Sequence, residues 1–224
     1  MKFLVFMIVL VVLVAGLATA AAAATLGYLD VVSNGSVDKD GSGFLGPSSE
    51  KTDLKISIIS AGTLIQDKYK LGAEYGIGSI AGTAISPKED VKIWSIKGGY
   101  RLVNAKAFKL DAIVAPLDLK TDSSQLKVIL GGVDVAQYFS TKMFLTASYV
   151  LGSGSNEKEG LPKDDSVPVH FFRAKFHYLL NDQVGLVAGY TSLKYKIDAV
   201  HPLYGHGAMD VTMGGPSLGL VYIF

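Results

Sequence analysis

The chain ends on the stretch Ser217-Leu218-Gly219-Leu220-Val221-Tyr222-Ile223-Phe224, which decides the fold. Large side chains at 218, 220, 222 and 224 alternate with a second set at 217, 219, 221 and 223. A period of two residues is typical of a β-strand, because successive side chains point to opposite faces of the sheet. The stretch therefore predicts a terminal strand that presents large apolar side chains on one face and ends on two aromatic residues, Tyr222 and Phe224.

The same alternation recurs throughout the chain. Eight further segments show it, at residues 54–58, 69–77, 94–100, 108–114, 126–130, 143–149, 172–178 and 184–190. A weaker segment at 26–33 and the terminal one at 213–224 bring the predicted number of strands to ten. Eight strands are the alternative if the first pair is short.

The connections between these segments alternate in length. Longer polar connections are expected at residues 34–51, 79–90, 118–124, 152–167 and 198–210, and short turns at 62–66, 103–106, 139–142 and 181–183. An even number of strands, with short turns at one end and longer loops at the other, is typical of transmembrane β-barrels. The predicted fold class is all-β, a transmembrane antiparallel up-and-down barrel.

A cleaved signal peptide is predicted at residues 1–24, followed by the barrel at 25–224. Lys2 supplies a positive charge, residues 3–17 are apolar, and Ala18-Thr19-Ala20 is a small-residue cleavage site, with a second candidate at residues 22–24. A membrane anchor is the alternative, because the apolar stretch is long enough to span a bilayer. The small residues after it favour cleavage.

Composition narrows the range of functions. The chain has 21 Lys and Arg against 20 Asp and Glu, so loss of Lys2 with the signal peptide leaves a neutral barrel and no indication of a nucleic-acid partner. It has no cysteine, which excludes a disulfide scaffold. A soluble secreted β-sandwich or lipocalin-like barrel is the alternative fold. Aromatic residues at the strand ends, such as Tyr69, Tyr100 and Trp94, favour the membrane barrel.

In architecture and in its C-terminal aromatic residues, the chain resembles small outer-membrane β-barrels of the OmpA/OmpX type. The resemblance implies that Gly219, Tyr222 and Phe224 form a signal for the barrel-assembly machinery. It also implies a location in the outer membrane of a Gram-negative-type cell envelope, in contact with outer-membrane lipid and lipopolysaccharide. The resemblance implies no ligand and no activity.

If the apolar faces meet lipid, the polar faces of the strands line the lumen. The charged residues on those faces are Lys55, Lys70, Glu74, Lys97, Lys109, Asp111, Lys127, Arg173, Lys175 and His177. Counting residues across the turns places Glu74, Lys97 and Asp111 at one height, with Arg173 and Lys175 facing them. Two functions follow: a structural or surface-interaction barrel whose lumen is plugged by this network, or a narrow anion-preferring pore.

Two weaker patterns lie outside the barrel wall. Asp38, Asp40 and Ser42 match positions 1, 3 and 5 of a calcium-binding loop, but the carboxylate needed at position 12 is replaced by Ser49. Calcium is therefore a weak candidate cofactor, and the default expectation is no cofactor. Histidines His170, His201 and His206 lie near the predicted rim without a catalytic motif around them. We expect the protein not to be an enzyme.

Overall fold

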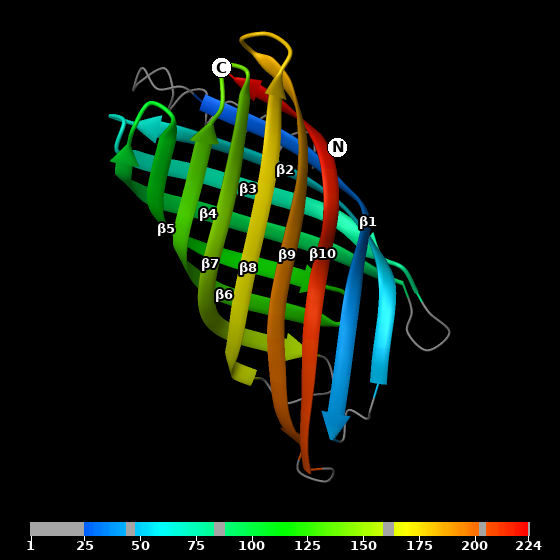
Figure 1. Cartoon of the computed structure of the whole chain (residues 1–224). Coiled ribbons are helices and arrows are strands. Elements are labelled where there is room, and N and C mark those ends of the chain that lie inside the picture. Colours follow the sequence, from blue (N-terminus) through cyan, green and yellow to red (C-terminus); the bar gives the residue numbers. More distant parts are fainter. Residues whose placement is uncertain (1–24, 44–47, 83–87, 159–163, 202–204, 224) are drawn as a thin grey trace, which may run out of the picture.

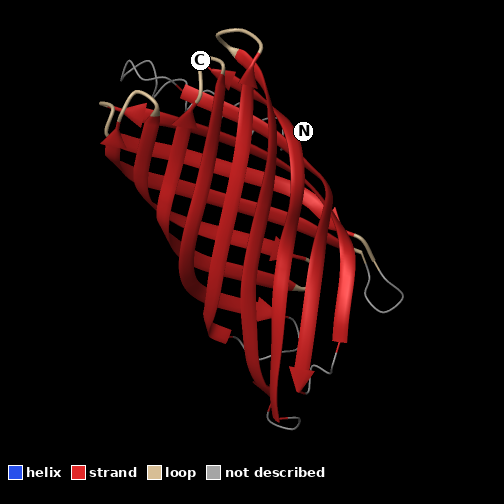
Figure 2. Cartoon of the chain, in the orientation of Figure 1, coloured by secondary structure: helices blue, strands red, loops and turns tan. Residues whose placement is uncertain are grey.

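The computed structural model describes residues 25–43, 48–82, 88–158, 164–201 and 205–223, and their strands form a closed antiparallel barrel (Figures 1 and 2). There are ten strands: β1 (Thr25–Gly43), β2 (Ser48–Ile65), β3 (Tyr69–Ile80), β4 (Glu89–Asn104), β5 (Phe108–Thr121), β6 (Ser124–Tyr138), β7 (Met143–Lys158), β8 (Asp164–Leu179), β9 (Val184–His201) and β10 (Gly205–Ile223). This confirms the predicted ten strands and not the alternative of eight. No helix long and apolar enough to cross a membrane occurs among the described residues.

Each strand pairs with its neighbours in sequence, and β1 closes the barrel against β10, with Leu26 opposite Ile223. The register is staggered around the barrel. A path that starts at Tyr69 and passes from partner to partner through β4 to β10 and β1 reaches Asp53 of β2, twelve residues from Ile65, the direct partner of Tyr69. Such a stagger inclines the strands to the barrel axis. Depth in the barrel must therefore be counted along each strand.

The two ends of the barrel differ, although less than the sequence predicts. Short connections join β2 to β3, β4 to β5, β6 to β7 and β8 to β9 at one end. At the other end, most of the predicted polar loops are strands: β1 continues to Gly43 and β2 begins at Ser48, while β5 and β6 are joined by Asp122 and Ser123 alone. The prediction of long loops was wrong here because polar and glycine-rich segments also pair when a neighbouring strand supplies the hydrogen bonds.

Buried and exposed side chains alternate with the two-residue period most clearly on β5, on β6 and in the last part of β10. On β10, Leu218, Leu220 and Tyr222 are 65%, 51% and 40% exposed, whereas Ser217 and Val221 are 3% and 1% exposed. The outward face of the terminal strand is therefore the one that the sequence predicts.

We call the end of the barrel opposite the short turns the long-strand end. The lumen near this end is apolar. All ten strands contribute to a contiguous buried cluster that fills it, which includes Leu54, Ile56, Ile58, Leu126, Val128, Leu130, Val150, Phe171, Leu193 and Met213. Two orientations were predicted wrongly: Lys55 and Lys127 are exposed on the outside, and the apolar residues that flank them point inward. These strands carry apolar residues on both faces, so the rule of polar inside and apolar outside fails for them.

The predicted signal peptide at residues 1–24 and the terminal Phe224 lie outside the described residues.

The orientation of β6 is tested by two adjacent residues. Leu130 is 2% exposed in the lumen, and Ile129 is 66% exposed on the outside. We expect Leu130→Ala to lower the free energy of unfolding by about 2–5 kcal/mol, because it leaves a cavity in a packed interior. The control Ile129→Ala should cost less, since lipid refills the space. Urea unfolding of the refolded protein in vesicles measures both, and the reverse order would mean that β6 is turned the other way.

Candidate functional site: a charged layer in the lumen

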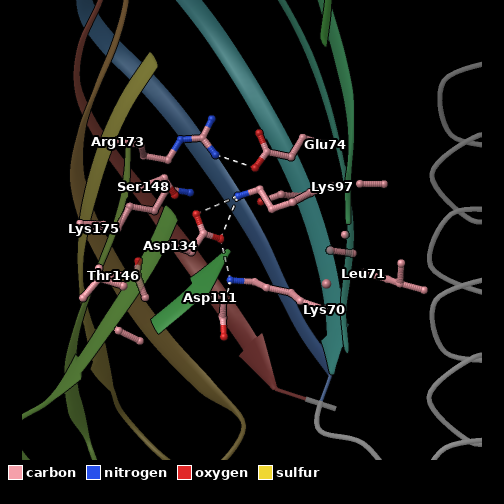
Figure 3. Close-up of a pocket in the computed structure, with 18 residues that line it drawn as sticks. Lys70, Leu71, Glu74, Lys97, Asp111, Asp134, Thr146, Ser148, Arg173 and Lys175 are labelled. Carbon is pink, nitrogen blue, oxygen red and sulfur yellow. Dashed lines mark hydrogen bonds and ion pairs between the residues drawn. The ribbon is translucent and has the colours of Figure 1, made fainter. Parts of the chain in front are cut away.

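The polar residues of the lumen gather toward the short-turn end. Lys70 and Glu74 come from β3, Lys97 and Arg101 from β4, Asp111 from β5, Asp134 from β6, and Arg173 and Lys175 from β8. Each occupies an inward position of its strand, and the barrel wall brings them to one region; Figure 3 shows all of them except Arg101. We call these eight residues the charged layer.

Asp134 is the centre of the charged layer. Its Oδ2 atom accepts hydrogen bonds from Lys70 Nζ at 2.6 Å and from Lys97 Nζ at 3.2 Å. The Asp134 side chain is 8% exposed, so two ammonium groups compensate one buried carboxylate. In Figure 3 both lysines reach it from the same wall.

Asp111 extends the charged layer toward the short turns. Arg101 Nε and Nη2 donate to its two carboxylate oxygens at 2.8 and 3.4 Å, a two-pronged contact typical of arginine with carboxylate. Lys70 Nζ also donates to Asp111 Oδ2, at 3.2 Å. Lys70 therefore bridges Asp111 and Asp134, and the ion pairs form one connected chain from β4 through β5, β3 and β6.

Glu74 and Arg173 connect opposite walls. Arg173 Nη1 donates to Glu74 Oε1 at 2.6 Å, and the two side chains are 9% and 20% exposed, respectively. Glu74 lies on β3 and Arg173 on β8, which are five strands apart in either direction around a barrel of ten. This ion pair therefore spans the diameter of the lumen (Figure 3).

A cavity of about 120 Å³ lies within the layer. Its charged lining consists of four basic residues, Lys70, Lys97, Arg173 and Lys175, and three acidic residues, Glu74, Asp111 and Asp134. Small and hydroxyl-bearing residues, among them Gly72, Thr146 and Ser148, complete the wall. The cavity has room for a few water molecules or a small ion and carries an excess of positive charge.

An aromatic cluster on β6, β7 and β8 lies in the lumen toward the short turns. The His177 ring stacks on Phe144 with 4.3 Å between centroids, and Phe144 stacks on Tyr138 at 5.3 Å. Thr146 Oγ1 lies 3.0 Å from His177 Nε2, and Lys109 Nζ lies 4.9 Å from the Tyr138 ring centroid. His177 is fully buried. Charged pairs on β3 to β6 and this cluster on β6 to β8 therefore both occupy the lumen toward the short turns.

The structure brings most of the predicted lumen residues together, but with different partners. Glu74, Lys97, Asp111, Arg173 and Lys175 all line the cavity. The expected position of Lys97 between Glu74 and Asp111 differs from its described hydrogen bonds, which go to Asp134. Counting across the turn had placed Asp111 opposite Lys97. Its actual partner in register is Arg101, because the turn between β4 and β5 lies at residues 105–107, closer to β5 than the count assumed.

Two central residues, Asp134 and Arg101, were missed. Both continue the alternation of a predicted strand beyond its predicted end: Asp134 has the same parity as Leu130, and Arg101 the same parity as Lys97. The glycines at 131 and 132 interrupt the apolar pattern and hid the continuation of β6. Extending β4 to its turn would have found Arg101, whereas Asp134 also required the correct face of β6, which the sequence pattern predicted wrongly.

The predicted calcium ligands do not converge. Asp38, Asp40 and Ser42 lie on the regular strand β1, where residues two apart are separated by about 6.6–6.8 Å. Calcium needs oxygen atoms that meet around one point at 2.3–2.6 Å. Asp38 instead lies 3.9 Å from Lys51 Nζ on β2. The described residues also contain no group of three or more His, Cys, Asp or Glu that is placed to hold a metal ion.

The outer wall is apolar over most strands. Large apolar side chains with at least two-fifths of their surface exposed include Leu71, Ile96, Leu102, Val114, Ile129, Leu151, Phe172, Leu186, Leu218 and Leu220. Exposed aromatic residues lie toward the short turns, where Tyr69 and Tyr100 pack edge to face at 5.7 Å, and further along the wall, at Trp94 and Tyr149. A closed barrel with an apolar band and aromatic girdles is suited to lipid. The chain is a transmembrane β-barrel of the outer-membrane type.

No protein-family model matches the chain, and no curated protein matches it. Among solved structures, it is similar to an outer membrane channel from Pseudomonas putida F1, with 10% identity over 90% of this chain and 96% of that chain and a TM-score of 0.49. It is also similar to the translocator domain of the autotransporter NalP from Neisseria meningitidis, with 9% identity over 99% and 96% and a TM-score of 0.44. Neisserial surface protein A is 16% identical over 90% and 99%, with a TM-score of 0.34. At these scores, the similarities carry no functional inference.

The ion pair across the lumen is tested by a double-mutant cycle. We expect Arg173→Ala to lower the free energy of unfolding by about 3–5 kcal/mol, because it leaves the Glu74 carboxylate without its partner inside the barrel. The double variant Glu74→Ala/Arg173→Ala should cost less than the sum of the single variants. As a control, Lys196→Ala removes an exposed pair with Asp198 and should change stability by about 1 kcal/mol or less. Strict additivity of Glu74→Ala and Arg173→Ala would show that the two residues are not coupled.

The terminal signal is tested by assembly. Tyr222 points outward at the end of β10, and Gly219 lies on the same strand opposite Asp30 of β1. We expect deletion of Phe224 to block assembly into the form whose gel mobility changes on heating. The substitutions Phe224→Leu and Phe224→Tyr, which keep the chain length, separate the need for an aromatic ring from the need for a residue at this position. Normal assembly of the deletion variant would contradict the proposed signal.

Proposed function

We propose that the protein is an outer-membrane barrel with a structural or surface-interaction role, and that its lumen is closed to ions. The observation that supports this most directly is the Glu74–Arg173 ion pair at 2.6 Å, which joins opposite walls of the barrel. The remaining ion pairs of the charged layer and the aromatic cluster occupy the lumen between this pair and the short turns.

The apolar part of the lumen supports the same proposal. Beyond the charged layer, side chains such as Leu130, Val150 and Phe171 are between 2% and 9% exposed and belong to one buried cluster. An ion that passes this region would lose its hydration shell without gaining polar partners, which is unfavourable by many kcal/mol. Two successive barriers of different chemistry, one ionic and one apolar, therefore oppose conduction.

The second candidate is a narrow anion-preferring pore. The excess of basic over acidic residues around the 120 Å³ cavity favours it, since Lys70, Lys97, Arg173 and Lys175 face three carboxylates. Positive charge in a confined passage attracts anions. This candidate requires that the apolar cluster open, whereas the closed barrel requires no rearrangement. We propose neither a catalytic role nor a cofactor.

The long-strand end supplies the surface for interactions. β1 and β2 pair as far as Gly41 and Ser48, and β9 and β10 pair as far as His201 and Gly205, well past the ten or so residues that cross a bilayer. These paired extensions form a stiff rim outside the membrane. We propose that partners on the cell surface contact this rim.

Conductance in a planar bilayer decides between the two candidates. Refolded protein, shown to be folded by its heat-modifiable gel mobility, should give no steady openings under a salt gradient. The variant Glu74→Ser/Arg173→Ser should also conduct little, because the apolar cluster stays in place. Steady openings of the unaltered protein with an anion-selective reversal potential would overturn the closed barrel and establish the pore.

A further inference from the structure

Basic groups outnumber carboxylates in the charged layer. Its eight residues comprise five basic side chains, Lys70, Lys97, Arg101, Arg173 and Lys175, and three carboxylates, Glu74, Asp111 and Asp134. Asp30 of β1 is opposite Gly219 in register, and counting it with the layer leaves five basic groups against four carboxylates. Over the residues that the structure describes, this level of the lumen therefore carries net positive charge.

The surroundings of the charged layer do not compensate this charge. On the side of the long-strand end, the lumen is filled by apolar side chains such as Leu130, Val150 and Phe171, and the outer wall of the barrel is apolar as well. A charge in apolar surroundings is unfavourable unless an opposite charge or hydrogen-bonding partners compensate it. An anion held within the layer would provide this compensation.

The cavity of about 120 Å³ offers a place for such an ion. Basic groups reach it from two walls, with Lys70 and Lys97 on β3 and β4 and Lys175 on β8 (Figure 3). The side chains of Lys70 and Lys97 are 30% and 19% exposed, so the interior of the layer is not closely packed around them. Ser60 of β2 also lines the cavity, and its hydroxyl group can donate a hydrogen bond to an anion.

We propose that this cavity binds one small monovalent anion of the size of chloride, as a fixed counter-ion of the charged layer. The ion lies between Lys97 and Lys175, on opposite walls, where the positive potential of both is greatest. A single negative charge matches the excess of five basic groups over four carboxylates. The proposal rests on the closed lumen proposed above, because in an open pore the same ion would pass through and not remain bound.

Binding is measured as stabilisation by chloride. The full chain, refolded into phosphatidylcholine vesicles, is unfolded with urea at constant ionic strength while chloride replaces the much larger anion gluconate. Constant ionic strength keeps the screening of surface charges unchanged. A ligand that binds only the folded state stabilises it by mass action, so we expect the urea midpoint to rise with chloride concentration in a saturable way.

Lys175 and Lys196 provide a matched pair of variants. Lys175→Met removes one basic group of the cavity and should weaken the apparent affinity for chloride by about tenfold or more, because a hydrogen bond to a charged group is lost. Lys196→Met removes an exposed ammonium group on the outside of the barrel and should respond to chloride as the unaltered protein does. Each variant is compared with itself at several chloride concentrations, so a change in its own stability does not affect the result.

Bromide locates the ion in the unaltered protein. Crystals grown in bromide should show an anomalous-scattering peak in the cavity, in contact with the Lys97 and Lys175 ammonium groups. This measurement needs no variant, so it tests the proposal also when Lys175→Met does not fold.

Three outcomes would overturn the proposal: equal midpoints of the unaltered protein in chloride and in gluconate, an unchanged chloride dependence of Lys175→Met, and a cavity without bromide. The closed lumen has its own test. A silent bilayer together with equal midpoints would leave the closed barrel in place and remove the bound anion, whereas steady openings would overturn the closed lumen itself.

Discussion

Closure of the sheet between β1 and β10 is the constraint on which the rest of the structure depends. A strand at the edge of an open sheet would present unpaired N–H and C=O groups to lipid, where no water replaces the missing hydrogen bonds. Pairing of Leu26 with Ile223, and of the residues that follow, removes both edges. Because ten strands close with a stagger of twelve residues, β3 and β8 face each other across the lumen, which allows Glu74 and Arg173 to meet.

The lumen of this barrel has two parts of different chemistry. Ion pairs and an aromatic cluster occupy the part toward the short turns, and a buried apolar cluster occupies the part toward the long-strand end. Buried ion pairs are stable only when each charge has well-placed partners, and Asp134, with Lys70 and Lys97, meets this condition. The apolar part needs only close packing. The charged part and the apolar part follow each other along the lumen, and both oppose the passage of ions. For this reason we favour a closed barrel over a pore.

The outer wall has its own division. Apolar side chains cover the membrane-spanning part, and the lysines of β4, β5, β6 and β9 lie beyond it. Lys127 shows why strand parity matters: it is exposed on the outside of the barrel, whereas on the other face it would point into the lumen. A shift of one residue exchanges the two roles, because the period of a strand is two.

The sequence by itself determined the class of fold, the number of strands, the outward face of β10 and the location of Glu74, Lys97, Asp111, Arg173 and Lys175 in the lumen. These properties depend on local alternation, which each strand carries independently of the others. The ion-pair partners depended on tertiary structure: Asp134 and Arg101 became central only through register, and the pairing of β4 with β5 places Asp111 opposite Arg101 and not opposite Lys97. The faces of Lys55 and Lys127 were also decided there, because strands that are apolar on both sides carry no local signal for which side is the inside.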